Sequence, residues 1–464
     1  METEGLRQST AASVTPGSST LAPVADAERI SSLDVLRGAA LLGIALMNIV
    51  FAGLPLSANS NPKVSGGSTG PNLAAFFLQH VLFDGKMRGL FSMMFGASAY
   101  LLIGRLERRG AGLRAAEIYY RRLLWLMLFG IVHAYLIWHG DILYPYALLG
   151  LVLLPLLRVR PGNLLIVAGI LLLIMTAQSV VQGFHLRKTH SLALEAYQAE
   201  AAGKPLTGEQ KTAKSEWEET RKDFSPPAED LREEKGMYSG SYFHLVAKRA
   251  ETVVDLHSMP FYLVNLDLLT MMLVGIAFIK SGVLSAERST RFYWRLLAIS
   301  SGICLPISVF AVWNSWQRGV ESLLTIFAFS TYPLCRAGMT LAHAAALLLF
   351  CKYRVWLSLQ TRLAAVGRMA LSNYIAHSLV YGFVFYGYGF NLFDKLQRYQ
   401  LYYLVLGMWI FSLVSSSIWL RHFRFGPLEW GWRSLTYWKR QPMRIGKPSV
   451  DLAFTASGAV TPSG

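Results

Sequence analysis

Long, nearly uncharged apolar runs recur along the whole of this chain. A run of about twenty apolar residues is long enough to cross the hydrocarbon core of a bilayer as a helix. Only 16% of the 464 residues are charged, against about 25% in an average soluble domain. Because backbone polar groups in lipid must be satisfied within the protein, such runs predict helices. We therefore expect an all-α fold, a polytopic transmembrane bundle whose main partner is the lipid bilayer.

Hydropathy predicts about ten spans. The fourth is short, and the eighth contains Pro333 and Arg336. The expected spans are 36–54, 83–104, 121–138, 142–157, 163–183, 261–279, 292–312, 325–350, 367–386 and 401–420.

Composition divides the chain further. The two ends are rich in small and polar residues, which predicts disordered tails. A long polar segment separates two transmembrane halves, and the second half includes a surface helix. The expected parts are the tail 1–28, the N-terminal half 29–183, the segment 184–260, the C-terminal half 261–440 and the tail 441–464.

The Lys and Arg residues predict the orientation, because cytoplasmic loops carry most of them. Basic clusters follow spans two, four, six, eight and ten, whereas the other short loops carry few. Both termini should therefore be cytoplasmic, and 184–260 should lie outside. That segment holds 11 Lys+Arg and 13 Asp+Glu, so the net charge of +16 belongs to the rest of the chain. Since membrane orientation already explains this charge, we expect no nucleic-acid partner.

The first polar cluster opens span one, in LDVLRGAALLGIALMNI. Asp34 and Arg37 are three residues apart and share a helix face. Asn48 lies about three turns beyond Arg37 on nearly the same stripe, and Gly38 and Gly43 allow another helix to approach closely. Two interpretations are open. The residues form an interfacial ion pair and an interhelical hydrogen bond, or they bind an anionic cytoplasmic ligand anchored by Arg37.

The second cluster is LFDGKMRGLFSMMFGAS, residues 82–98. Asp84 and Arg88 are four residues apart and can pair if both lie on a helix, while Lys86 points elsewhere. A charge inside the bilayer costs about 2.5–3.5 kcal/mol on insertion scales, so it requires a partner or a cavity. The cluster is either an outer girdle of interfacial charges or part of a binding site.

The third cluster is GIVHAYLIWHGDILYPY, residues 130–146. Histidine accepts and returns a proton near neutral pH, and a carboxylate can orient it. His133 and Asp141 can meet only if the chain turns back at Gly140, and His139 is the weaker candidate base. The alternative is that His133 bonds a neighbouring helix and HGD only makes the turn. The spacing H-x5-H-x-D matches no standard metal site, so we expect no metal.

Two further stretches complete the pattern. In GRMALSNYIAHSL, residues 367–379, Asn373 and His377 are four apart on one face, which favours an interhelical contact as much as a substrate site. FGPLEWGWRSLTYW, residues 425–438, predicts an amphipathic helix on the cytoplasmic surface, with its tryptophans at the headgroup level.

These five stretches occur in the same order in the YeiB-like family, which this chain resembles over about residues 29–440. That family consists of bacterial inner-membrane proteins with a domain of unknown function. It is similar to a wider superfamily of transmembrane acyltransferases, which includes the lysosomal heparan glucosaminide acetyltransferase. Those enzymes carry acyl groups from cytoplasmic acyl-CoA to acceptors across the membrane.

The resemblance implies a multi-pass protein of the bacterial inner membrane. It also implies an acyltransferase that uses acyl-CoA as a co-substrate, with no bound cofactor. The acceptor is an envelope sugar, a lipid or a small hydroxylated molecule. In this reading Arg37 holds the CoA phosphates, Asn48 donates a hydrogen bond to the thioester carbonyl, and Lys86 and Arg88 stabilise oxyanion or acceptor charge.

The catalytic base differs from the superfamily pattern. The acetyltransferases place a histidine in or just after the first span, but residues 29–79 here contain none. His133, oriented by Asp141, is the best-placed base, and His377 is held in reserve. We also expect Arg37, Asn48, Lys86 and Asp141 to converge. Two other functions remain open, a transporter or exporter of a small metabolite and a non-catalytic membrane scaffold.

Overall fold

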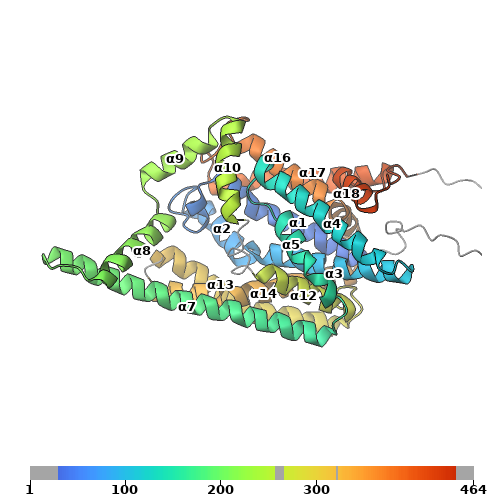
Figure 1. The fold of residues 1–464 in the computed structure, drawn as a ribbon, viewed down its shortest axis with the longest axis horizontal. Coiled ribbons are helices and arrows are strands. Elements are labelled where there is room, and N and C mark those ends of the chain that lie inside the picture. The colour runs from blue at the N-terminus through green and yellow to red at the C-terminus, as the bar shows by residue number, and fades with distance from the viewer. Residues whose placement is uncertain (1–29, 257–265, 320–321, 446–464) are drawn as a thin grey trace, which may run out of the picture.

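The computed structural model describes residues 30–256, 266–319 and 322–445, and within them the regular elements are helices (Figure 1). Two π-helical turns, Gln79–Phe83 and His133–Ile137, follow α2 and α4. The helices are α1 Ser31–Gly53, α2 Gly70–Leu78, α3 Lys86–Arg108, α4 Arg114–Val132, α5 Leu143–Leu151, α6 Leu153–Leu156, α7 Pro161–Ala201, α8 Gly208–Phe224, α9 Ala228–Tyr238, α10 Tyr242–Leu256, α12 Asp267–Lys280, α13 Thr290–Arg318, α14 Leu323–Lys352, α15 Leu357–Arg368, α16 Ala370–Phe385, α17 Arg398–His422 and α18 Pro427–Tyr437.

Seven helices in the described chain are long and apolar enough to cross a membrane. They confirm a helical membrane protein, but the count of ten spans is not confirmed. Three expected spans correspond to shorter helices, because α5, α12 and α16 have 9, 14 and 16 residues. Hydropathy measures how apolar a segment is, but it does not locate the ends of its helix, so it cannot tell these short helices from full spans. The expected tail 1–28 lies outside the described residues, as do residues 446–464 of the expected tail 441–464.

Helix α1 lies at the centre of the bundle. Most of its side chains are buried, whereas α7 and α13 expose apolar side chains along much of their length. Helix α1 packs against α3, α15, α16 and α17. The helix that carries the first polar cluster is therefore largely enclosed by other helices, although Arg37 and Asn48 stay partly exposed.

Glycines set the closest helix contacts of α1. A Cβ added to Gly38 would lie 2.0 Å from the carbonyl oxygen of Leu363 on α15, close to Gly367. A Cβ added to Gly43 would lie 2.4 Å from the side chain of Met87 on α3. The close approach that the sequence predicts at these two glycines is confirmed, and it is typical of small residues between membrane helices.

The same arrangement joins α3 to α12. A Cβ on Gly275 would lie 2.0 Å from the carbonyl oxygen of Met93, and one on Gly96 would lie 2.1 Å from that of Met272. The backbones of the two helices are in direct contact here. As a result, the charged residues in the first turn of α3 lie beside those in the first turn of α12.

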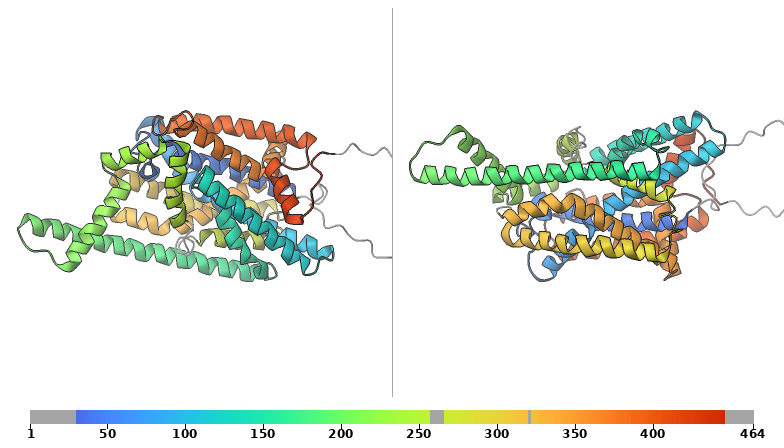
Figure 2. Two further views of the ribbon diagram at one scale, coloured as in Figure 1. Left: turned by 45° about the horizontal axis from the view of Figure 1, so that its top comes forward. Right: turned by 90° about the horizontal axis from the view of Figure 1, so that it is seen from below.

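The cap, which we define as residues 208–256, covers one end of the bundle. Helix α7 extends beyond the other helices, and α8, α9 and α10 return from its tip (Figures 1 and 2). The cap bonds the loops that follow α1 and α16. Asn61 donates to the carbonyl oxygen of Phe224 at 3.0 Å, and the amide of Gly387 donates to that of Tyr238 at 2.8 Å.

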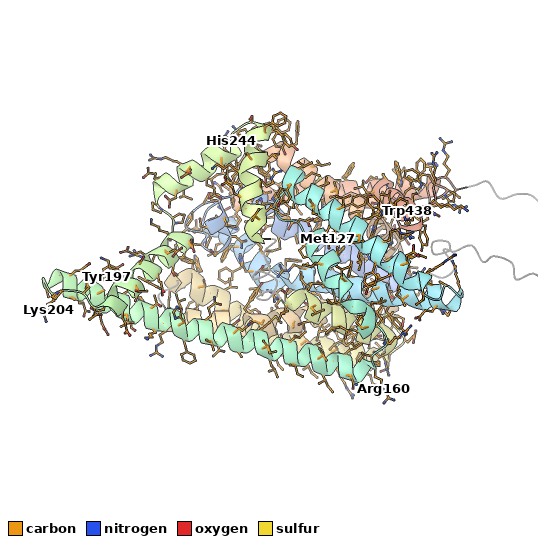
Figure 3. All side chains as sticks on the ribbon, viewed as in Figure 1. Met127, Arg160, Tyr197, Lys204, His244 and Trp438 are labelled. Atoms are coloured by element: carbon orange, nitrogen blue, oxygen red, sulfur yellow. The ribbon has the colours of Figure 1, made fainter. Side chains whose placement is uncertain are left out.

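The opposite end carries α18 and the turn between α3 and α4. The indole N–H of Trp432 donates to the carbonyl oxygen of Arg122 at 2.8 Å, and the Arg122 guanidinium lies 3.6 Å from the centre of the Trp432 ring. Arg160 and Trp438 lie toward this end, and Lys204 lies at the far tip of α7 (Figure 3). The basic loops and the 184–256 segment are thus at opposite ends.

Candidate active site at His133

His133 lies where α4 passes into the π-helical turn, and it is 1% exposed. Its Nδ1 lies 2.8 Å from Oδ1 of Asp141, and its Nε2 lies 2.9 Å from Oγ of Ser378 on α16. The imidazole therefore bridges a carboxylate and a hydroxyl. This is the arrangement of an orienting acid, a base and a nucleophile.

The chain turns back at Gly140, as the pairing of His133 with Asp141 requires. Trp138 is extended after the π-helical turn. The second carboxylate oxygen of Asp141 accepts a hydrogen bond from the amide of Tyr144 at 2.7 Å, in the first turn of α5. Both oxygens of this carboxylate are held, so its direction toward His133 is fixed by the turn and by the following helix.

Ser378 is the site residue that the sequence reasoning missed. Tyr374 lies one turn before it, with its ring centre 4.9 Å from that of His133. The Tyr374 hydroxyl donates to the carbonyl oxygen of Gly140 at 3.1 Å. The sequence held one signal for Ser378. Tyr374 and Ser378 are four residues apart, as are Asn373 and His377, so they form a second polar pair on an adjacent face of the same helix.

Asn373 and His377 face a different helix. The amide of Asn373 donates to Oγ of Ser416 at 2.9 Å, and Nε2 of His377 lies 3.0 Å from Oγ of Ser412. All four side chains are buried. Of the two interpretations drawn from the sequence, the structure shows the interhelical contact, here between α16 and α17.

Arg37 and Asp34 form the ion pair that their spacing predicts, at 2.7 Å. The guanidinium also donates to Oγ of Ser98 on α3 at 2.8 Å. About a fifth of the Arg37 side chain is exposed, at 22%. Asn48 is half-buried, and its amide makes no hydrogen bond to the described part of the chain.

Arg88 pairs with Asp267 of α12 at 3.0 Å, and Arg336 of α14 lies 3.5 Å from the same oxygen. The Asp84–Arg88 pair that the spacing allows is not formed. Helix α3 begins only at Lys86, so the four-residue rule of a helix does not apply to Asp84. Its carboxylate instead accepts a hydrogen bond from the Tyr332 hydroxyl at 3.1 Å.

Lys86 is buried and donates to the carbonyl oxygen of His80 at 2.5 Å. It belongs to the same end of α3 as Arg88. Ser98, which holds Arg37, lies twelve residues further along α3, which is roughly 18 Å. The expected convergence of Arg37, Asn48, Lys86 and Asp141 is therefore not found. Their contacts divide them among separate clusters.

Known proteins resemble this chain over most of its length. A family model described as "Protein of unknown function (DUF418)" matches residues 278–439. The uncharacterized protein YxaH of Bacillus subtilis (strain 168) is 31% identical over 430 residues, which cover 92% of this chain and 98% of the relative. The uncharacterized protein YeiB of Escherichia coli (strain K12) is 29% identical over 422 residues, covering 88% and 96%.

No solved structure matches the chain. The alignments to YxaH and YeiB extend through both halves of the bundle, so they include the helices that carry His133, Asp141 and Ser378. On this similarity, the chain belongs to the YeiB-like family of membrane proteins, which carry a domain of unknown function.

Proposed function

We propose that this protein is an inner-membrane acyltransferase, which moves an acyl group from cytoplasmic acyl-CoA to a hydroxyl group on an envelope sugar, a lipid or a small molecule. One observation carries the proposal. His133 lies within hydrogen-bond distance of both Asp141 and Ser378. In this arrangement Asp141 orients the imidazole, His133 is the base, and the Ser378 hydroxyl is the nucleophile.

The first half of the proposed reaction forms an acyl ester on Ser378. The serine Oγ attacks the thioester carbonyl, and its proton passes to Nε2 of His133. The carbon–sulfur bond then breaks, and His133 returns the proton to the leaving CoA thiolate. Asp141 holds the imidazole in place and stabilises its protonated form.

The second half transfers the acyl group. The acceptor hydroxyl attacks the ester carbonyl while His133 takes its proton. The bond between the acyl carbon and the serine oxygen breaks, and Ser378 recovers the proton from His133. The enzyme ends in its starting state, and the acceptor leaves as an ester.

The position of Ser378 suits a donor and an acceptor that arrive from opposite ends. It lies six residues along α16 from Ser372, or roughly 9 Å. Oγ of Ser372 contacts Glu429 of α18. The cap lies beyond the other end of the helix. In the proposed path Arg37, near the α18 end, holds the CoA phosphates, and the half-buried amide of Asn48 is available to the thioester.

The test uses the purified protein in nanodiscs with radiolabelled acetyl-CoA. We expect label on the protein, and slow release of acetate when no acceptor is present. Ser378→Ala should lose both. Ser412→Ala is the matched control, because this serine also bonds a buried histidine but has no carboxylate behind it. Equal labelling of Ser378→Ala and the unmodified protein would refute the proposal.

A transporter remains the second candidate, and a different observation favours it. Inside the bundle, between α3, α12 and α14, the Asp267 carboxylate forms ion pairs with two arginines. Beside it lies a cavity of about 10 Å³, lined by Asp267, Thr270, Arg336 and Thr340, with room for about one water molecule. A transporter would bind its substrate without consuming acyl-CoA, and the Ser378→Ala protein would keep full uptake in proteoliposomes.

A further inference from the structure

Helix α10 of the cap buries a cation at the centre of its inner face. Leu245, Arg249 and Val253 are spaced by four residues and form the buried stripe of this helix. Arg249 is 5% exposed. An arginine at such a position is unfavourable unless an anion or several acceptors replace its water.

The acceptors present do not satisfy Arg249. One terminal nitrogen, Nη1, lies 3.4 Å from the carbonyl oxygen of Tyr135 in the π-helical turn. The other, Nη2, is buried without a hydrogen-bond partner. Among the described residues no carboxylate forms an ion pair with this guanidinium, and Glu251 of the same helix pairs with Lys248 at 3.6 Å.

Two more buried polar groups belong to the same region, the indole N–H of Trp138 and the hydroxyl of Tyr386. They lie close enough to interact with each other, but neither makes a well-formed hydrogen bond. Both rings lie in one hydrophobic cluster with Leu245 of α10. The charge of Arg249 reaches this region, since burial first and Arg249 second lower the pKa of His139 to about 4. The three donors therefore lie around the inner face of α10.

This region adjoins the candidate active site. The ring of Trp138 lies 6.5 Å from that of His133, centre to centre. The carbonyl oxygens of the π-helical turn that begins with His133 accept hydrogen bonds from Arg249 and from the Tyr242 hydroxyl, at 3.4 and 2.9 Å. A group bound at Arg249 would thus lie beside the residue that we assign as the base.

We propose that Arg249, Trp138 and Tyr386 bind an anionic oxygen group, a carboxylate or a phosphate, on the acceptor molecule. Such a group only accepts hydrogen bonds, which complements a cluster of donors, and a guanidinium binds its oxygens in pairs. This inference rests on the proposed function. It identifies the acceptor as an anionic hydroxylated compound, held by the cap while its hydroxyl reaches Ser378 and His133.

Binding of small probes tests the inference without requiring turnover. Detergent-purified protein is titrated by calorimetry with D-glucuronate and glucose 1-phosphate, and with D-glucose as the neutral counterpart. We expect at least one anionic probe to bind ten-fold or more tightly than glucose. Arg249→Gln should abolish this preference, and Lys248→Gln, which changes the neighbouring charge on the exposed side of α10, should retain it.

Two further variants test the same site in case the Arg249→Gln protein does not fold. Trp138→Phe keeps the ring but removes the N–H donor, and it should weaken the anionic probe several-fold. Arg249→Lys keeps the charge and should retain part of the preference. The inference fails if no probe shows a preference for the anion, or if Arg249→Gln and Trp138→Phe both keep the preference of the unmodified protein.

The Ser378→Ala protein separates this inference from the proposed function. It should bind the anionic probe as tightly as the unmodified protein, because Ser378 is not part of the donor cluster. An anion preference that depends on Arg249, in a protein whose Ser378 is never acylated, would refute the acyltransferase and leave the binding site intact. Acylation of Ser378 without any anion preference would refute the binding site alone.

Discussion

Nε2 of His133 and Oγ of Ser378 lie 2.9 Å apart although 245 residues separate them in the chain. A second pair also involves α16: His377 of that helix lies at nearly the same distance, 3.0 Å, from Ser412 of α17. Only the first histidine has a carboxylate on its other nitrogen. That difference distinguishes an oriented base from a packing contact.

Replacing His133 with Ala should reduce acyl transfer by a factor on the order of 10²–10⁴, which is the usual contribution of general acid–base catalysis. Asp141→Asn should reduce it less, because Asp141 orients the base and does not carry the proton. His377→Ala is the matched control and should keep most of the activity. The rates are compared for protein that elutes normally on size exclusion. A fully active His133→Ala protein would exclude it as the base.

Adding one methyl group at Gly38 should destabilise the bundle. A Cβ there would lie 2.0 Å from the carbonyl oxygen of Leu363, so α1 and α15 must move apart. We expect Gly38→Ala to lower the free energy of unfolding by about 1–3 kcal/mol, as overpacking usually does. Gly104→Ala on α3 is the control, because nothing lies within 4 Å of its added Cβ. Thermal unfolding in detergent gives the unfolding midpoints of both variants. A Gly38→Ala midpoint equal to that of Gly104→Ala would contradict the tight contact.

Glu429 should make stability depend on pH. Burial raises the pKa of this carboxyl, against the hydrogen bonds from Ser372 that lower it. In the interval above the ordinary glutamate pKa, the folded protein binds more protons than the unfolded chain does. The contribution of Glu429 is therefore complete at low pH and is lost as the pH rises through its folded-state pKa.

Glu429→Gln removes this titration but keeps an oxygen that can accept from the Ser372 hydroxyl. The unfolding midpoint of the variant should change less between acidic and neutral pH than that of the unmodified protein. Glu209→Gln on the exposed start of α8 serves as the control and should follow the unmodified protein. Parallel pH curves for Glu429→Gln and the unmodified protein would exclude Glu429 as the source.

The orientation in the membrane can be tested with single cysteines in a cysteine-free background. A membrane-impermeant maleimide added to intact cells should label a cysteine at Ser215, in the cap. It should spare one at Leu113, in the turn between α3 and α4, until the membrane is permeabilised. Both positions are exposed. The reverse pattern would overturn the predicted cytoplasmic location of the basic loops and the termini.

Local patterns in the sequence determined a large part of this structure. Apolar runs predicted the helical membrane bundle, and the alternation of basic loops predicted which loops share an end. The pairing of His133 with Asp141 was also predictable, since only a short segment containing Gly140 separates them and the chain has few ways to close it. The glycine contacts of α1 followed from the need of small residues at close helix crossings.

Contacts between distant helices were decided only by the tertiary structure. Ser378 beside His133 and Asp267 beside Arg88 depend on which helices are neighbours and how each is rotated. Spans that are apolar on most faces carry little periodicity from which to read that rotation. The Arg249 cluster shows the same limit. In the sequence Arg249 is one of many charged residues. Only the packing of α10 onto the bundle buries it and leaves one of its terminal nitrogens without a hydrogen-bond partner.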